Sequence, residues 1–348
     1  TVNLELSLSG PASDDVSVAY AATGGSATGG VDYTLDSSTA PILAGNLTTT
    51  IAITIADDLV AEGNETIEVT ISSPSDNAEL GTNTVHTYTI QDNDTAGVVI
   101  SESGGLTDVT EGGTTDDYTV ALTAEPAADV TVTVGSDAQV DVAPTSLTFA
   151  PGNWDTPQTV TITAVDDTVY EGSHYSTITH TLTSTDGNYD GMSTGTVTAA
   201  ITDDESIPAI QFTQTISQGS ESITTVNLEL SLSGYASQAV TVNYAPSGGS
   251  ATGAGVDYTL DSGTATIPAD SLTTNITLAI VDDLIAEGDE TIAVTISSPS
   301  SYAVLGTNTV HTYTIQDNES ANIIIAQSGG STAVTEGGAT DDYTVVLT

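Results

Sequence analysis

Short runs of alternating apolar and polar residues recur along the chain. Ile51, Ile53 and Ile55 are separated by polar or small residues, and the segment IEVTI at 67–71 repeats the pattern. Because successive side chains of a β-strand face opposite sides, this two-residue period predicts strands with one buried face. No segment sustains the 3.6-residue period of an amphipathic helix. The chain is therefore predicted to be all-β.

Turn-forming segments separate these runs throughout. Val130, Val132 and Val134 form one run and residues 160–164 form the next, while Gly-rich and Asp-rich pieces such as ATGGSATGGVDY lie between runs. Roughly six to eight short strands per about 110 residues, with turns between them, are typical of an antiparallel sandwich. We predict tandem antiparallel β-sandwich modules, immunoglobulin-like, in a linear array.

The same sequence blocks return at a nearly constant distance. TVNLELSLSG occurs at 1–10 and at 225–234, and LGTNTVHTYTIQDN occurs at 80–93 and at 305–318, an offset of 225 residues (305 − 80). VTEGGTTDDYTVALT from Val109 returns as VTEGGATDDYTVVLT from Val334. A unit of this length holds two modules, which we name A and B.

The repeats predict four segments in series. They are module A1 (residues 1–94), module B (95–205), module A2 (206–319) and the start of a second module B (320–348). Module A1 lacks an equivalent of AIQFTQTISQGSES at 209–222, the first strand region of module A2. We expect the chain to be a window from a longer periodic sequence. The alternative is that a neighbouring molecule donates the missing strand, which would produce a polymer.

The charge is one-sided: 47 Asp and Glu and no Lys or Arg give a formal net charge of −47. Compact modules then need bound cations, or enough salt to screen the repulsion between carboxylates. The same charge repels nucleic acid and anionic membrane surfaces, so we expect neither as a partner. No apolar run approaches the roughly 20 residues of a membrane helix, and we expect no membrane insertion. The absence of Cys excludes disulfides and thiolate metal sites.

The most informative motif is DDLVAEGNET at 57–66, repeated as DDLIAEGDET at 282–291. Each copy has two adjacent Asp, a Glu five residues after the first Asp and a second Glu eight residues after it. Strand patterns precede and follow the motif, so its carboxylates lie on a loop at one end of the sandwich. Ca²⁺ takes about six to eight oxygen ligands, and such a loop supplies them.

These motifs resemble the Calx-beta family, which is named for the calcium-binding domains of sodium/calcium exchangers and is found in bacterial and animal surface proteins. The resemblance rests on GVDYT at 30–34 and 255–259, on the two acidic loops, and on the module ends TIQDND (89–94) and TIQDNE (314–319). It implies Ca²⁺ sites where the end loops meet the linker to the next module. The implied ligands are Asp32, Asp57, Asp58, Glu62, Glu65, Asp92 and Asp94 in module A1, and Asp257, Asp282, Asp283, Glu287, Glu290, Asp317 and Glu319 in module A2.

Module B keeps only part of this pattern. The resemblance implies the ligands Glu111, Asp166, Asp167, Glu171, Asp203 and Asp204, and the module ends in TDDE. His174 stands where module A has its second Glu, and Ca²⁺ does not favour imidazole. The resemblance therefore supports Ca²⁺ more strongly in module A than in module B. In module A2, Gln218 stands where the family usually has an early Glu, so that site binds fewer ions or uses Glu221 instead.

The acidic loops also have an ordinary interpretation. Asp, Asn and Gly form turns, and an acidic loop by itself is usually solvated surface. Three acidic segments converge here at fixed spacing, twice over, in a chain without Lys or Arg. That combination favours a metal site over a plain solvated loop.

No catalytic constellation stands out. Two carboxylates could in principle hydrolyse a glycoside, but these acids recur with the modules, whereas catalytic pairs are usually unique. The one GxSxG match, GMSTG at 191–195, leads into a strand-like segment and not into the helix of a nucleophile elbow. We expect that the protein is not an enzyme.

The linkers QDNDTAG and TDDESIP are short, so Ca²⁺ held beside them would fix each module against the next. We expect an extracellular or cell-surface structural protein: a Ca²⁺-stiffened rod or filament whose partners are neighbouring modules of the same chain and identical chains. Two alternatives are an adhesin that binds glycan or a partner protein through end loops, and a Ca²⁺ sensor in which the ion changes the angle between modules.

Overall fold

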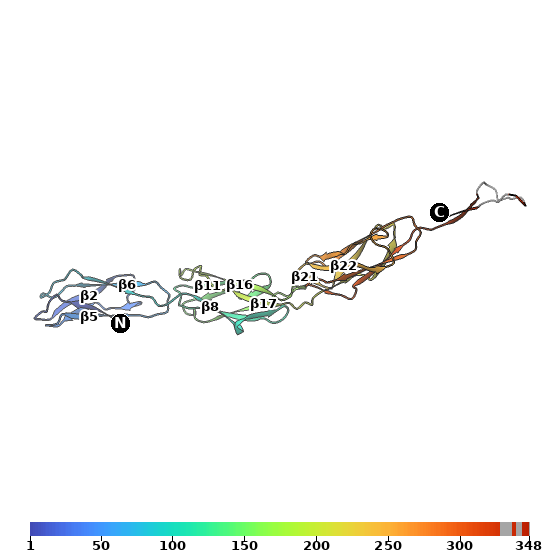
Figure 1. Cartoon of the computed structure of the whole chain (residues 1–348). Helices are drawn as coiled ribbons and strands as arrows, with labels where there is room; N and C mark the ends of the chain where they lie inside the picture. Colours follow the sequence, from blue (N-terminus) through green and yellow to red (C-terminus); the bar gives the residue numbers. More distant parts are fainter. Residues whose placement is uncertain (328–335, 339–342, 348) are drawn as a thin grey trace. The chain divides into compact units, whose positions relative to one another are not determined.

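The computed structural model describes residues 1–327, 336–338 and 343–347. These residues form two compact units. The first contains Thr1–Val109, Thr114–Ala164 and Tyr175–Ala200, and the second contains Thr110–Gly113, Val165–His174 and the described residues from Ile201 onward. The regular structure of both units is built from strands, as predicted (Figure 1). No helix in these described ranges is long and apolar enough to cross a membrane.

Module A1 is a sandwich of two sheets. One sheet has the strand order β1-β5-β3 and the other has the order β4-β2-β6-β7. In β5 the buried Ile51 and Ile53 alternate with the exposed Ala52 and Thr54, so the period of the sequence is the period of burial. The strands are β1 (Val2–Ser7), β2 (Val16–Gly24), β3 (Tyr33–Thr34), β4 (Ser38–Ile42), β5 (Thr48–Ile55), β6 (Glu65–Ser72) and β7 (Val85–Ile90).

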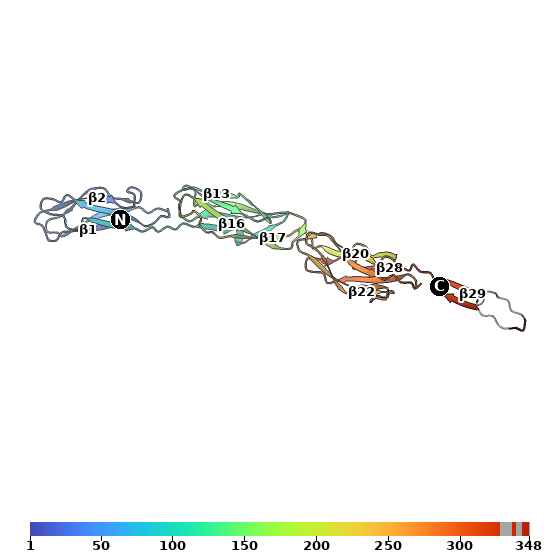
Figure 2. The ribbon, with the colours of Figure 1, turned by 90° about the horizontal axis from the view of Figure 1, so that it is seen from above.

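Module B is also a two-sheet sandwich, with the orders β12-β14-β10-β8 and β13-β11-β16-β17-β9. Val130 and Val132 of β11 and Val160 of β14 are fully buried between the sheets. Figure 2 shows β13, β16 and β17 in this module. The elements are β8 (Val98–Glu102), the 3₁₀ turn η1 (Ser103–Gly105), β9 (Thr107–Thr110), β10 (Asp116–Leu122), β11 (Val130–Gly135), β12 (Val140–Ala143), β13 (Ser146–Phe149), β14 (Gln158–Ala164), β15 (Val169–Tyr170), β16 (His174–Ser184) and β17 (Val197–Thr202).

Module A2 has two five-stranded sheets, ordered β23-β25-β20-β18-β27 and β19-β28-β26-β22-β24. Its core includes Ile210, Phe212 and Leu230, all fully buried. The strands are β18 (Ala209–Phe212), β19 (Ile216–Ser220), β20 (Thr225–Leu232), β21 (Tyr235–Ala236), β22 (Val240–Gly249), β23 (Tyr258–Thr259), β24 (Gly263–Ile267), β25 (Thr273–Ile280), β26 (Glu290–Ser297), β27 (Val304–Leu305) and β28 (Val310–Gln316).

Modules A1 and A2 differ at one edge, although their sequences are nearly the same there. In module A2, β18 pairs with β20 and β19 pairs with β28. In module A1 the strand equivalent to β20 is β1 and the strand equivalent to β28 is β7, and each of these lies at the edge of its sheet. A groove of about 1170 Å³ lies beside them. His86 on β7 is exposed, whereas the equivalent His311 on β28 is buried, with 3% of its surface exposed.

The last described strands, β29 (Ile323–Gln327) and β30 (Tyr343–Leu347), form an antiparallel pair. Ile323 lies opposite Leu347, as Val98 lies opposite Leu122 in module B. The predicted start of a second module B at 320–348 also includes residues 328–335, 339–342 and 348, which lie outside the described residues. The all-β fold class, with several β-sandwich modules in series, is confirmed.

Candidate metal centres at the module ends

In module A1 the predicted ligands line one cavity of about 220 Å³. They reach it from three segments: the turn before β3, the loop between β5 and β6, and the chain after β7. Asp32, Glu62 and Glu65 can bring one carboxylate oxygen each to within 4.8 Å of the others. The cavity is lined by Asp32, Asp57, Asp58, Glu62, Glu65, Asp92 and Asp94, together with backbone and apolar residues.

Two of these carboxylates hold the loops in place. The backbone N–H groups of Glu62 and Asp94 donate to the two oxygens of Asp92, at 2.8 and 2.9 Å. Asp58 accepts from the backbone N–H of Val60, two residues later (3.0 Å), which is the hydrogen bond of an Asx turn. These hydrogen bonds link the loop to the chain after β7, and the other predicted carboxylates line the cavity.

Module A2 repeats these contacts. Asp317 accepts from the backbone N–H groups of Glu287 (2.8 Å) and Glu319 (2.9 Å). The backbone N–H bond from Glu319, together with that from Glu287, lowers the pKa of Asp317. Repulsion from neighbouring carboxylates contributes to the raised pKa of Glu287 and Glu290, after the larger effect of burial. The predicted ligands whose charge acts on these two groups are Asp257, Asp283, Glu287 and Asp317.

The first Asp of each A loop has a neutral partner. The side-chain amide of Asn93 donates to Asp57 (3.4 Å), and that of Asn318 donates to Asp282 (3.2 Å). At the equivalent position module B has Asp204, which cannot donate when ionised. Module B therefore lacks this neutral contact at its own loop.

The second compact unit holds the acidic cluster of module B. Three overlapping groups can each place ligand atoms within 4.8 Å of one another. Asp203 again fixes the loops, because it accepts from the backbone N–H groups of Glu171 and Glu205 (2.8 and 3.0 Å). The three groups are Asp166, Asp204 and Glu205; Glu111, Asp167 and Glu205; and Glu111, Glu171 and His174.

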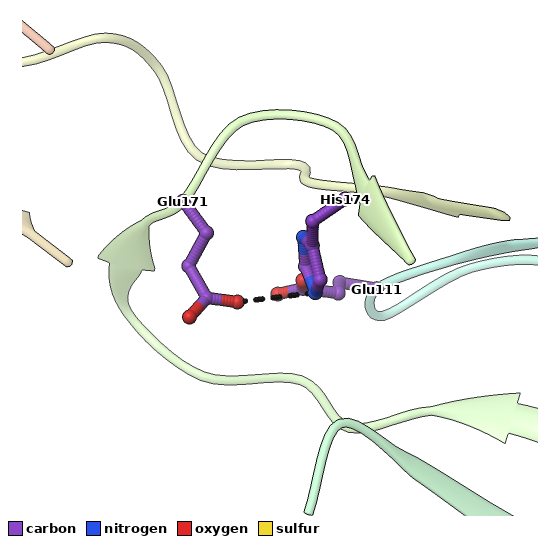
Figure 3. A group of neighbouring side chains, drawn as sticks. All are labelled: Glu111, Glu171 and His174. Carbon is purple, nitrogen blue, oxygen red and sulfur yellow. Dashed lines mark ion pairs between the residues drawn. The ribbon is translucent and has the colours of Figure 1, made fainter. Parts of the chain in front are cut away.

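Glu111 is the most buried member, with 2% of its surface exposed, and neither of its carboxylate oxygens has a hydrogen-bond partner among the described residues. Figure 3 shows its side chain reaching toward Glu171 and His174. The next residue, Gly112, has φ +56°, and a Cβ there would come within 3.2 Å of Asp166 and 3.3 Å of Asp204. A buried carboxylate without a partner is costly, so this cluster fits a bound cation.

In module A2 the structure favours Glu221, the second of the two possibilities that the sequence left open for the early acidic position. Gln218 is exposed, whereas Glu221 is buried. Glu221 donates its backbone N–H to the carbonyl of Gln316 (3.1 Å), just as Glu111 donates to the carbonyl of Thr202 (3.1 Å). Glu221 can join Asp317 and Glu319 around one ion. The sequence contains a spacing that indicates this assignment. The first fully buried residue of the next strand lies seven residues after the Glu in both modules: Tyr118 after Glu111, and Leu228 after Glu221.

The donor sets fit Ca²⁺. Each A-type site offers carboxylate oxygens from three segments, and Ca²⁺ accepts six to eight oxygens at roughly 2.3–2.6 Å. In module A2, oxygens of Glu221, Asp317 and Glu319 lie within 4.8 Å of one another, and a bound cation would offset the repulsion between these carboxylates.

The acidic loop of module A1 contacts module B, and the acidic loop of module B contacts module A2. In the first unit, the backbone N–H of Glu125 donates to the carbonyl of Leu59 (2.7 Å), and Val60 pairs with Glu125 in a parallel bridge. The side-chain amide of Asn188 donates to the carbonyl of Ala61 (2.8 Å). The three residues between the paired Asp and the Glu of the A1 loop are therefore bonded to module B.

The equivalent loop of module B makes the same kind of contact within the second unit. Its strand β15 pairs in parallel with β21 of module A2. The backbone N–H of Ser237 donates to the carbonyl of Tyr170 (3.1 Å), and the rings of Tyr170 and Tyr302 lie edge to face with centroids 6.2 Å apart. One loop thus carries both predicted ligands and the contact to the next module.

We predict that the sites load poorly in acid. Burial, followed by repulsion from Asp203 and its neighbours, raises the pKa of Glu111 to about 7. A hydrogen bond to Glu221, followed by burial, raises the pKa of Glu319 to about 7. Burial, followed by a hydrogen bond to Asp32, raises the pKa of Glu65 to about 6. Because Ca²⁺ binds the ionised form, calorimetry should show weaker binding and greater proton uptake by buffer at pH 5.5 than at pH 8.

The metal-free chain should show the opposite dependence in its stability. A carboxyl whose pKa is higher in the folded state binds more protons there, so the free energy of unfolding falls as pH rises from about 4.5 to about 7. Thermal unfolding with a chelator, at matched ionic strength, measures this slope. A stability that rises across this window would contradict the clustering of these carboxyls.

Comparison with known proteins identifies the family. Residues 1–94, 106–205 and 203–327 each match the Calx-beta domain. The crystal structure of the apo form of the Calx CBD1 domain is 21% identical with a TM-score of 0.31, and the match covers 32% of this chain and 99% of that one. CBD12 from CALX1.2 is 18% identical with a TM-score of 0.31, covering 62% and 99%. No curated protein matches the chain. Calx-beta repeats bind Ca²⁺ and are typically non-catalytic; this chain belongs to the Calx-beta family and contains three of its repeats.

Proposed function

We propose that Ca²⁺ bound at the module ends stiffens this chain as a structural repeat protein of an extracellular or cell-surface fibre. One observation carries the proposal: the loop that supplies Asp57, Asp58 and Glu62 also supplies the backbone that bonds to module B. An ion that orders this loop therefore also orders the contact between the modules. The equivalent loop of module B stands in the same relation to module A2.

The composition supports an environment rich in salt and Ca²⁺. With 47 acidic residues and no Lys or Arg, the sequence has no side chain other than its four His that can carry a positive charge. Extracellular Ca²⁺-binding modules work at dissociation constants of roughly 10⁻⁴–10⁻³ M, which suits sites that fill outside the cell. At residues 284–286 of module A2 the equivalent loop is exposed, with Leu284 at 90% and Ile285 at 60%. This loop is available for the same kind of backbone contact with a following module.

Small-angle X-ray scattering with and without a chelator tests the proposal. With Ca²⁺ we expect a narrow distribution of chain dimensions, and without it a broader one, because the junction loops lose the ion that holds their carboxylates together. Glu65→Gln should shift the Ca²⁺ form toward the metal-free result. Glu68→Gln removes the same charge from an exposed position on β6 outside the cavity and serves as the control. Equal scattering with and without Ca²⁺ would refute the mechanical role.

A further inference from the structure

The site of module B differs from both A sites at two ligand positions. Val140 lies opposite Ala164 of β14, and Tyr33 lies opposite Ile55 of β5. Each of these partners stands two residues before the first Asp of its acidic loop, so Gln139 takes the place of Asp32. His174 takes the place of the second Glu of the acidic loop. A carboxylate has become an amide and another has become an imidazole. Both changes lower the negative charge, and the second replaces an oxygen ligand with a nitrogen.

The imidazole of His174 is oriented for metal binding. Its Nδ1 lies 2.9 Å from the carbonyl oxygen of Gly172. A carbonyl only accepts, so Nδ1 carries the hydrogen and donates it. The other nitrogen, Nε2, then faces the Oε2 of Glu171 at 3.3 Å (Figure 3). A backbone carbonyl that fixes the tautomer in this way is the usual outer partner of a metal-bound His.

A third group is directed at the same point from another segment. Glu111 is almost fully buried, and both of its carboxylate oxygens lack a hydrogen-bond partner among the described residues. Ligand atoms of Glu111, Glu171 and His174 lie within 4.8 Å of one another. Two ligands at about 2.0–2.1 Å from a tetrahedral ion are roughly 3.3 Å apart. The distance between His174 Nε2 and Glu171 Oε2 has this value.

We propose that His174 Nε2, Glu111 and Glu171 form a site for a divalent transition-metal ion of the Zn²⁺ type. Imidazole nitrogen suits Zn²⁺ and its neighbours, whereas Ca²⁺ and Mg²⁺ prefer oxygen alone. The adjacent group of Asp166, Asp204 and Glu205 is all carboxylate and remains suited to Ca²⁺. Module B then holds two kinds of ion at one junction. The inference concerns module B alone and does not depend on Ca²⁺ binding by modules A1 and A2.

The simpler alternative is a protonated His174 that forms an ion pair with Glu171 and binds no metal. It accounts for the 3.3 Å distance, but it leaves both oxygens of the buried Glu111 without a hydrogen-bond partner among the described residues. A metal ion between the three side chains would satisfy all of them. The two possibilities differ in whether Zn²⁺ binds with a dependence on His174.

The test is a Zn²⁺ titration of the full chain in excess Ca²⁺, which is monitored by calorimetry and by NMR of the four histidines. We expect one tightly bound Zn²⁺ and a Zn²⁺-dependent shift at His174. His180 and His311 already use both ring nitrogens in hydrogen bonds and should not shift. His174→Glu installs the residue that module A carries there, and should lower Zn²⁺ affinity by at least roughly 10- to 100-fold. His86→Ala removes the exposed His and is the control.

A reciprocal variant makes the test independent of any loss of folding. Glu290 of module A2 corresponds to His174, and Glu287 and Glu221 correspond to the other two ligands. Glu290→His is therefore expected to create a second Zn²⁺ site. Binding of Zn²⁺ that persists unchanged in His174→Glu, that is lost in His86→Ala, or that is absent from the native chain would overturn the proposal. A Ca²⁺ titration of the same samples separates that result from a failure of the A sites.

Discussion

Addition of Ca²⁺ to the metal-free chain is expected to raise its unfolding temperature by roughly 10–20 °C when free Ca²⁺ is about a hundred times the dissociation constant. A ligand that binds only the folded state then stabilises it by about 2.7 kcal/mol per site. For a domain of about 100 residues, each kcal/mol shifts the midpoint by about 4–8 °C. The physical source is the relief of repulsion among the carboxylates of each junction, such as Asp32, Glu62 and Glu65.

Differential scanning calorimetry measures this shift, and two controls separate site binding from screening. NaCl at the same ionic strength screens all 47 acidic residues but does not occupy a site. Mg²⁺ carries the same charge but needs near-ideal octahedral geometry and gives up its water reluctantly, so its effect should be smaller. If NaCl alone reproduces the full shift, the acidic loops are solvated surface and not metal sites.

The second large effect distinguishes a core leucine of module A2 from an exposed leucine of the same module. Leu230→Ala should destabilise module A2 by about 2–5 kcal/mol, because Leu230 is fully buried in the core that includes Phe212. Leu284→Ala should cost much less, since 90% of the surface of Leu284 is exposed. The cost of truncating a leucine depends on how tightly its surroundings pack around it, and that differs between these two positions.

Denaturant unfolding measures both losses of stability. Hydrogen exchange follows module A2 through the amides of β28, which pairs with β19, and these should be protected in the native chain. Equal losses of stability in the two leucine variants would contradict the difference in packing.

Local patterns predicted the strands, the repeats and the acidic loops because each depends on residues close together in the sequence. Alternation along Ile51 to Ile55 sets one face of a strand, and paired Asp followed by Glu at fixed spacing requires only one loop. The family resemblance extended these patterns to residues from three segments, and in module A1 the structure gathers them in one cavity.

Other features depended on partners distant in the sequence. Glu221 takes the early acidic position because its backbone bonds to Gln316, a register that the letters SQGSES do not reveal. In the sequence, His174 indicated that module B has one carboxylate ligand fewer than module A. The direction of its ring depends on its contacts with Gly172 and Glu171, which only the structure shows.

The sequence by itself determined the all-β modules, their repetition and the acidic chemistry of their ends. Only the tertiary structure decided which of the acidic residues are buried and which of them share a site. Glu111 and Glu221 are buried, whereas Glu68 and Glu229 are exposed. The physical reason is that burial and electrostatic environment come from strands and loops brought together by folding, and these are not encoded in the residues beside each side chain.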